Sequence, residues 1–148
     1  MLKRLLGIAP NVEPDGSYSP SKLALKLATV KKTDFEEISY PKYQGKKSKV
    51  LVICTEQKNM TMKNGTLFST GNHPVETLLP MLHLHNAGFD FDIATPTGKP
   101  AVFEMWAFPD QDEHVKSLYN THKSRFERPT SLQTFADKAL SVSESYAA

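Results

Sequence analysis

Two stretches decide the fold of this chain: Lys49-Val-Leu-Val-Ile-Cys54 and Phe89-Asp-Phe-Asp-Ile-Ala-Thr95. The first is β-branched and almost wholly apolar, which is typical of a parallel strand covered on both faces. Between the two stretches a helical pattern begins at Asn72 and ends near Asn86, with Gly88 as a stop signal. Strand, helix and strand together predict a βαβ unit, whose crossover is nearly always right-handed. The sequence therefore predicts an α/β fold.

The helix and the segment before it carry more specific signals. Apolar residues recur at helical spacing, at Val75, Leu78, Leu79 and Leu82. We expect Asn72 to cap this helix and Pro80 to kink it. Ahead of it, Asn64-Gly65 lies between two short runs, and this pair tolerates the positive φ angles of a type I′ turn. The sequence therefore predicts a small hairpin over residues 61–68.

The flanking regions differ in character. Residues 1–45 mix proline and glycine with polar residues and show one short helical pattern, around Leu23, Leu25 and Leu27. We interpret them as an N-terminal arm or cap, and residues 46–148 as the N-terminal part of the α/β domain. After the second strand we expect an aromatic-rich excursion over residues 102–108 and helices over residues 112–126 and 131–140.

We expect the α/β domain to be incomplete in this chain. A helix that follows a strand normally returns to another parallel strand, and Ser141 to Ala148 look like the approach to one. Two central strands and a hairpin cannot cover the apolar faces of three helices. A large exposed hydrophobic surface is therefore expected, either in half of a protein or in a protein with a partner.

Composition excludes several classes of protein. The formal charge of +2 implies no polyanionic partner, and Lys46, Lys47 and Lys49 are interpreted as a solvated approach to a strand, so no specific nucleic-acid site is expected. The single cysteine, Cys54, excludes an intrachain disulfide. No run of about 18 apolar residues is present, so nothing is expected to span a membrane. We expect a cytoplasmic protein.

The segment Ser69-Thr-Gly-Asn-His-Pro-Val-Glu76 is the densest in chemically useful residues. It leads into the first helix, and in open α/β sheets the active crevice lies where such helices begin. Glu76 is therefore a candidate catalytic carboxylate, on the same helix face as His83. A glutamate in a first turn is also favoured by the helix dipole without any function. Neighbouring glycine, asparagine and histidine residues favour the functional interpretation.

A second set is His85, Asp90 and His122. Two histidines and a carboxylate can hold zinc or another divalent metal, with positions left for water. Scattered histidines are more often surface or core residues, so this alternative stays open. Cys54 ends the first strand, where a buried and inert thiol is the common outcome. Glu56 beside it would discourage ionisation of the thiol.

Several motifs together resemble one known family, the bacterial heat-shock chaperone, glyoxalase III and protein deglycase family of the PfpI-like superfamily. The matching segments are Phe68-Ser-Thr-Gly-Asn-His-Pro-Val-Glu-Thr-Leu-Leu-Pro80, His83-Leu-His85, Ala87-Gly-Phe89 and Phe103-Glu-Met-Trp-Ala107. The resemblance covers about residue 40 to the C-terminus and implies a flavodoxin-like sandwich with a parallel central sheet.

The resemblance also implies an activity. Members convert methylglyoxal to lactate without a cofactor, repair early glycation adducts on proteins, and hold unfolded clients in the stress response. A cysteine at a strand-to-helix elbow acts with a neighbouring histidine and a glutamate that Glu76 matches, and His73 would line the same pocket. The elbow cysteine lies beyond Ala148 in the family, so we expect this chain alone to be inactive. A homodimer is expected for the full-length protein.

The family's metal site of two histidines and a glutamate falls on His85, Asp90 and His122, with aspartate in place of glutamate. A possible zinc ion there is expected to be structural. Two other hypotheses stay open: a non-catalytic chaperone or binding module that exposes apolar surface, and a simple metal-binding domain.

Overall fold

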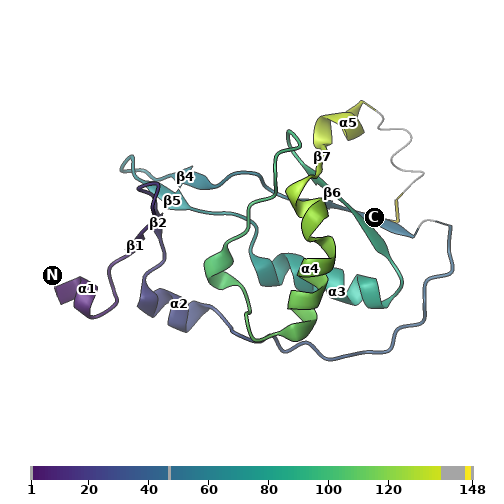
Figure 1. Cartoon of the computed structure of the whole chain (residues 1–148), viewed down its shortest axis with the longest axis horizontal. Helices are drawn as coiled ribbons and strands as arrows, with labels where there is room; N and C mark the ends of the chain where they lie inside the picture. The colour runs from purple at the N-terminus through teal and green to yellow at the C-terminus, as the bar shows by residue number, and fades with distance from the viewer. Residues whose placement is uncertain (1, 47, 138–145, 148) are drawn as a thin grey trace.

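A parallel pair of strands, β3 (Lys49–Ile53) and β6 (Asp90–Thr95), forms the centre of the fold (Figure 1). The computed structural model describes residues 2–46, 48–137 and 146–147. A third strand, β7 (Thr130–Ser131), continues the sheet in parallel on the far side of β6, which gives the order β3-β6-β7. The predicted α/β class, of flavodoxin-like type with a parallel central sheet, is confirmed.

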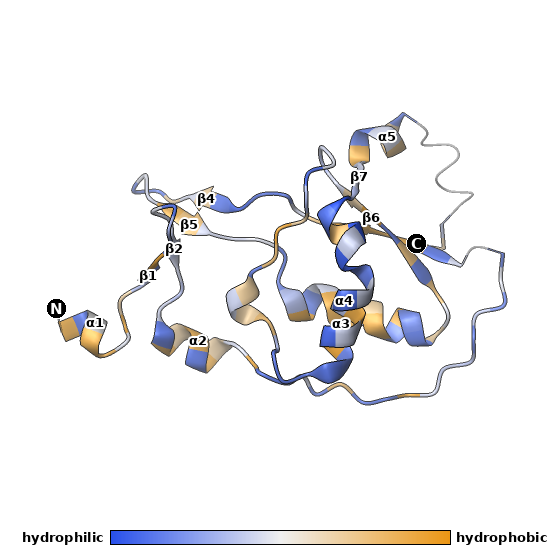
Figure 2. Cartoon of the chain, in the orientation of Figure 1, coloured by the Kyte–Doolittle hydropathy of each residue, from blue (hydrophilic) through white to orange (hydrophobic). Residues whose placement is uncertain are grey.

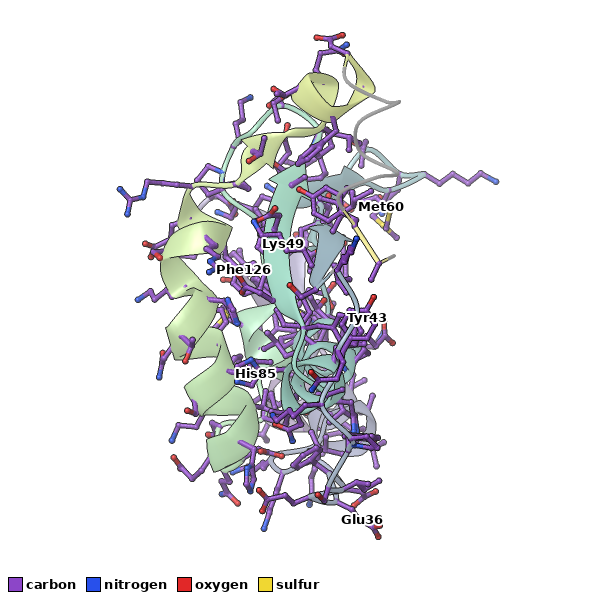
Figure 3. The ribbon with its side chains drawn as sticks, turned by 90° about the vertical axis from the view of Figure 1, so that its right-hand side faces the viewer. Glu36, Tyr43, Lys49, Met60, His85 and Phe126 are labelled. Carbon is purple, nitrogen blue, oxygen red and sulfur yellow. The ribbon has the colours of Figure 1, made fainter. Side chains whose placement is uncertain are left out.

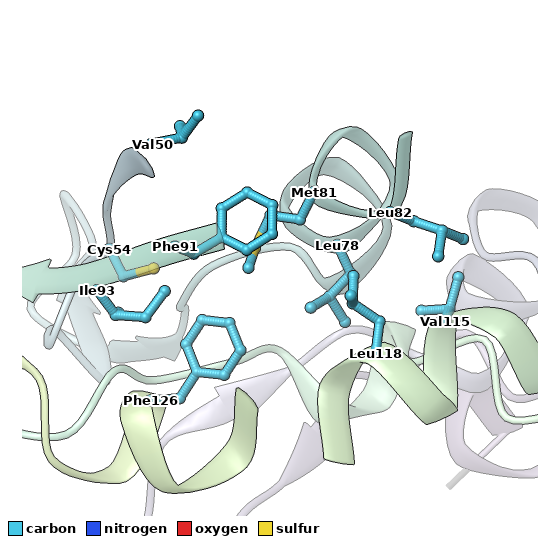
Figure 4. Close-up of a cluster of buried hydrophobic side chains, with 10 residues drawn as sticks. All are labelled: Val50, Cys54, Leu78, Met81, Leu82, Phe91, Ile93, Val115, Leu118 and Phe126. Atoms are coloured by element: carbon cyan, nitrogen blue, oxygen red, sulfur yellow. The ribbon is translucent and has the colours of Figure 1, made fainter. Parts of the chain in front are cut away.

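Two helices cover one face of this sheet: α3 (Pro74–Asn86) and α4 (Glu113–Glu127). Both crossovers advance in the same direction, from β3 to β6 and from β6 to β7, so right-handed connections place both helices on the same face. Figure 4 shows the resulting core between β6, α3 and α4. It is made by Val50, Cys54, Leu78, Met81, Leu82, Phe91, Ile93, Val115, Leu118 and Phe126.

The opposite face of the β3–β6 pair is more polar and more open. Lys49 forms an ion pair with Asp92, with 3.0 Å between Nζ and Oδ2, and the hydroxyl of Tyr146 donates to the same oxygen at 2.7 Å. Ile53 points to this side and is 58% exposed. This face therefore contributes to the exposed apolar surface that the sequence predicts.

A second, smaller sheet has the strand order β1-β2-β5-β4. Its strands are β1 (Asn11–Val12), β2 (Tyr18–Ser19), β4 (Asn59–Thr61) and β5 (Leu67–Ser69). The antiparallel pairing of β4 with β5 confirms the predicted hairpin. The predicted type I′ turn is wrong, because only Gly65 of the central pair has a positive φ, of 81°. The amide of Met62 donates to the carbonyl of Thr66, which closes a three-residue loop, and Asn64 accepts hydrogen bonds from the amide and hydroxyl of Thr66 across the glycine.

The remaining elements are short: α1 (Leu2–Leu5), α2 (Lys22–Ala28), the 3-10 turn η1 (Met105–Ala107) and α5 (Leu132–Ala136). The predicted α2 and the start of α5 are confirmed, whereas the end of the predicted helix at Leu140 lies outside the described residues. Figure 2 colours parts of α1 and α2 as hydrophobic, and Leu5 and Leu27 on these helices are exposed. Among the described helices, none has the length and apolar character needed to cross a membrane.

The segment that follows α2 runs along the α/β unit. The amide of Tyr43 donates to the carbonyl of Ala87 at 2.8 Å, and the Tyr43 ring stacks on Phe89 with 4.6 Å between centroids. Residues 18 and 68 pair in parallel, so the N-terminal region shares its sheet with the hairpin. The domain boundary at residue 45 stays a prediction.

Asp112 ties this segment to the start of α4. Its side chain caps the helix by accepting from the amide of Val115 at 3.1 Å, and it also accepts from the amide of Thr33 at 3.0 Å and from the Thr33 hydroxyl. Burial acts to raise the pKa of Asp112, but these hydrogen bonds outweigh burial and hold the pKa below its usual range. The carboxylate is therefore a charged buried link between two distant segments.

We expect Asp112→Ala to lower the free energy of unfolding by about 2 to 4 kcal/mol, because it removes a helix cap and leaves buried donors unpaired. Urea unfolding followed by circular dichroism measures the effect. Asp110→Ala, which removes an exposed carboxylate two residues away, is the matched control and should change the midpoint little. Equal shifts for the two variants would contradict the assignment.

Candidate functional site

The N-terminus of α3 differs from the sequence prediction in one respect. The capping position is His73, whose side chain makes no capping hydrogen bond, rather than Asn72. The side chain of Asn72 turns back instead, accepting from the amide of Thr55 at 2.9 Å and donating to its carbonyl at 3.0 Å. These tertiary partners outcompete the local cap. Pro74 at the first helical position has a fixed φ suited to the helix and lacks an N–H that would have no partner within the helix.

Asn72 also joins the loop to the aromatic-rich segment. Its backbone amide and its carboxamide both donate to the carbonyl of Val102 at 2.7 Å, and its own carbonyl accepts from the amide of Glu104 at 3.1 Å. Gly71 makes this close approach possible, since a Cβ there would lie 2.8 Å from the Val102 oxygen. The end of β3, the start of α3 and residues 102–104 are therefore fixed against one another.

This bridge brings three titratable side chains together: His73, Glu76 and Glu104. Burial raises the pKa of Glu104, the negative charge of Glu76 raises it further, and the charge of His73 acts in the opposite direction. His73 is half-buried and its Nδ1 atom is buried without a hydrogen-bond partner. Glu76 lies in the first turn of α3 and is exposed. Two carboxyl groups and an imidazole therefore lie close enough for their charges to act on Glu104, and residues of these types are suited to general acid–base chemistry.

Sequence reasoning missed Glu104. It lies in the Phe103-Glu-Met-Trp-Ala107 segment, which has neither helical nor strand periodicity, and 28 residues separate it from Glu76. Only the bridge at Asn72 brings the two carboxyl groups near each other. A polar residue embedded in an otherwise apolar, aromatic segment is the one signal that could have identified it.

Cys54 lies on the core face of the sheet, as the sequence predicts. The side chain is buried in the cluster between β6 and the two helices. Burial raises the pKa of its thiol to about 11. Such a thiol is protonated at neutral pH and is not suited to be a nucleophile.

His83 has a structural environment. Its Nδ1 atom lies 2.9 Å from the hydroxyl of Tyr40 in a hydrogen bond, and its ring packs against Phe35 with 5.0 Å between centroids. Both partners come from the segment that follows α2. His83 therefore holds that segment on α3, and no described contact joins it to Glu76.

The predicted metal ligands meet at the other end of α3, about 14 Å along the helix from Glu76. The rings of His85 and His122 are 6.3 Å apart between centroids, and Figure 3 shows His85 on the side of α3 that faces α4. His122 is buried, and neither of its ring nitrogens has a hydrogen-bond partner. Burial lowers its pKa, which favours the neutral imidazole that a metal requires.

Asp90 does not join this pair as a ligand. Its Oδ1 atom binds Nη1 of Arg125 at 2.6 Å, and this hydrogen bond is the main reason that the pKa of Asp90 is lowered. Over residues 2–46, 48–137 and 146–147, no group of three His, Cys, Asp or Glu side chains is placed to hold a metal ion. Because Asp90 pairs with Arg125, the described residues do not form the predicted three-ligand set, and the zinc site stays a prediction.

Comparison with known proteins identifies close relatives of one kind, although no family model matches the chain. The chain is 45% identical over 140 residues to the protein/nucleic acid deglycase HchA of Pseudomonas aeruginosa (strain LESB58), which covers 94% of this chain and 48% of that protein. It is 41% identical over 138 residues to the protein of the same name from Escherichia coli O157:H7, covering 93% of this chain and 48% of the relative. The chain thus spans about half the length of the curated relatives it matches.

We expect Cys54 to react slowly with thiol reagents in the folded protein. A rise of the thiol pKa from 9.0 to about 11 lowers the thiolate fraction at neutral pH about a hundredfold, and burial slows access further. Ellman's reagent at pH 7 measures the rate in folded protein and in urea. Reaction of the folded protein at the rate of the unfolded one would contradict the core placement.

Proposed function

This chain belongs to the same PfpI-like family as its deglycase relatives, and on that premise we propose that it supplies the acid–base half of a protein or nucleic acid deglycase. The similarity over nearly its whole length, at 41 to 45% identity, carries the proposal. These relatives are protein/nucleic acid deglycases, a name that gives protein and nucleic acid as what those proteins act on. The expectation of no nucleic-acid partner is therefore not kept in the proposal.

Within the proposed reaction, Glu76 and Glu104 have different roles. Glu76 is exposed at the start of α3, where it can reach a substrate carbonyl or hydroxyl and transfer a proton. Glu104 is more buried and its pKa is raised, so it retains a proton more readily than an ordinary glutamate. The buried, unpartnered Nδ1 of His73 supplies a further polar contact for a substrate oxygen or for water.

The proposed nucleophile is a thiol other than Cys54, because that side chain is buried and protonated. In such a reaction the thiolate adds to the carbonyl carbon of the adduct or of free methylglyoxal, and the carbonyl oxygen takes up a proton. A carboxylate then moves a proton from the first carbon to the second, which gives a lactoyl thioester, and water releases lactate and regenerates the thiol. With an adduct, the amine also leaves and takes up a proton, so both sequences are redox-neutral overall. A glyoxalase III activity is thus included in the proposal.

We expect the 148-residue protein to leave methylglyoxal and methylglyoxal-modified peptides unchanged by itself. We expect activity when it is mixed with the half of the Pseudomonas relative that it does not match, since that half is proposed to supply the thiol. Lactate release and mass spectrometry of the peptide measure the two outcomes. Glu76→Gln should lower the restored rate at least about a hundredfold, whereas Cys54→Ser should leave it unchanged. Activity of the chain alone, lost on Cys54→Ser, would contradict the proposal.

A second candidate function is the holding of unfolded proteins, favoured by exposed apolar side chains in the N-terminal region. Leu5 is 85% and Leu27 is 77% exposed, and both project from short helices. Exposed apolar residues can contribute to a protein-binding surface when they form a contiguous patch. This function needs no thiol and is therefore compatible with the 148 residues alone.

We expect the double substitution Leu5→Glu with Leu27→Glu to reduce suppression of heat-induced aggregation of a client protein, measured by light scattering. Lys3→Glu with Lys26→Glu changes charge on the same helices without removing apolar surface, and is the matched control. Equal loss in both variants would indicate a charge effect, and no suppression by the wild type would reject this candidate.

A further inference from the structure

The α2 helix exposes two adjacent rows of side chains with different chemistry. Residues four positions apart lie on one face of a helix, so Lys22 and Lys26 form one row. Leu23 and Leu27 form the row beside it. All four side chains are exposed, Leu27 to 77%, and no residue of α2 is buried. The helix therefore presents leucines flanked by lysines to its surroundings.

The leucine row faces away from the body of the protein. Leu25 lines a hollow together with Met105, Trp106 and Phe108. At 3.6 residues per turn, Leu25 lies nearly opposite Leu27 on the helix. Contact with residues 105–108 is therefore made by the side of α2 that carries Leu25, and the leucine row has no partner there.

The α1 helix adds to the same surface. Gly7 has a positive φ of 68° and reverses the chain after α1, and its carbonyl accepts from the amide of Leu23 at 3.0 Å. Figure 1 shows α1 and α2 next to each other at the N-terminal end of the molecule. Leu2 is 68% exposed and Leu5 is 85% exposed. Leucines of two neighbouring helices are thus open to solvent in one region.

The charge of this region is positive. Five exposed lysines lie within residues 2–32, at positions 3, 22, 26, 31 and 32, and neither helix carries a carboxylate. In the part of the chain that the structure describes, no ion pair joins Lys22 or Lys26 to a carboxylate. Asp110, which lines the hollow beside α2, offsets only part of this charge.

We propose that α1 and α2 bind this protein to the surface of an anionic lipid bilayer. The leucines would enter the boundary between headgroups and acyl chains, while the long lysine stems keep their charges at the headgroup phosphates. A second copy of the chain fits less well, because a symmetric contact through this surface would bring lysines close to lysines. A nucleic acid would attract the lysines and leave the leucines in water.

This inference does not rest on the proposed deglycase function, since it concerns the N-terminal helices alone. It shares its leucines with the second candidate function, the holding of unfolded proteins. The lysine row separates the two, because an anionic surface requires the positive charges and an apolar client segment does not. A variant that lacks the row should therefore lose lipid binding and keep its suppression of client aggregation.

The test is co-sedimentation of the 148-residue protein with vesicles of phosphatidylglycerol and phosphatidylcholine in equal parts. Vesicles of phosphatidylcholine alone serve as the neutral surface. We expect binding to the anionic vesicles at low salt, a decrease as added salt screens the lysines, and only background sedimentation with the neutral vesicles. Lys22→Gln with Lys26→Gln should weaken the binding at least about tenfold. Leu27→Gln should weaken it about tenfold by removing apolar surface.

Lys116→Gln with Lys123→Gln is the matched control, because it removes the same two charges from another helix. On α4 these lysines pair with Glu113 at 2.8 Å and with Glu127 at 3.9 Å. The control should leave the binding to vesicles nearly unchanged. Circular dichroism checks that each variant is folded, and the exposure of the exchanged α2 side chains favours this.

Several outcomes would overturn the inference. One is no binding to the anionic vesicles, or equal binding to the neutral ones. Another is the same loss in the α4 control, which would reduce the effect to net charge. Unchanged binding by Leu27→Gln would mean that the lysines act alone, as they would on a nucleic acid. Binding that is lost when the unmatched half of the Pseudomonas relative is added would mean that this half covers α1 and α2.

Discussion

The carboxamide of Asn72 is the constraint on which the candidate site depends. It closes a two-way hydrogen bond with the backbone of Thr55 at the end of β3 and donates to the carbonyl of Val102. A side chain with both a donor and an acceptor is needed, and aspartate or leucine at this position would leave buried backbone groups unpaired. Because three segments meet at one residue, the positions of His73, Glu76 and Glu104 are set by a single backbone arrangement.

The elements predicted from sequence were those whose signal is local. The apolar run of β3 and the helical spacing of α3 need no knowledge of distant residues, and both formed with nearly the expected bounds. The predictions of the α3 cap and of the hairpin turn were wrong for the same physical reason. The side chains of Asn72 and Asn64 can each form the predicted local structure or hydrogen-bond other backbone groups. The sequence does not show which of these partners lie within reach in the fold.

The residues of the candidate site also differ in whether a local signal in the sequence could predict them. The segment from Ser69 to Glu76 was identified because helices begin at the active edge of an α/β sheet, which is a property of position. Glu104 was missed because a tertiary bridge, and no periodicity, brings it to the site. The hydrogen bonds of Arg125 could not be predicted from the sequence, for a different reason. A basic residue on a polar helix face is normally solvated, and only the free edge of β6 gives it partners.

Exposure of Glu76 joins the acid–base residues to the rest of the proposed reaction. Water around an exposed carboxylate must reorganise whenever a proton moves, so such a carboxylate transfers protons poorly until water is excluded. Under the proposed function, the part of the protein that supplies the thiol must therefore also exclude water from Glu76, so that one contact both shields and activates this carboxylate. The histidine pair at the other end of α3 has no such requirement, because His122 is already buried between α4 and β6. The proposed acid–base residue Glu76 and the residue His85 can thus be altered separately, because they lie at opposite ends of α3.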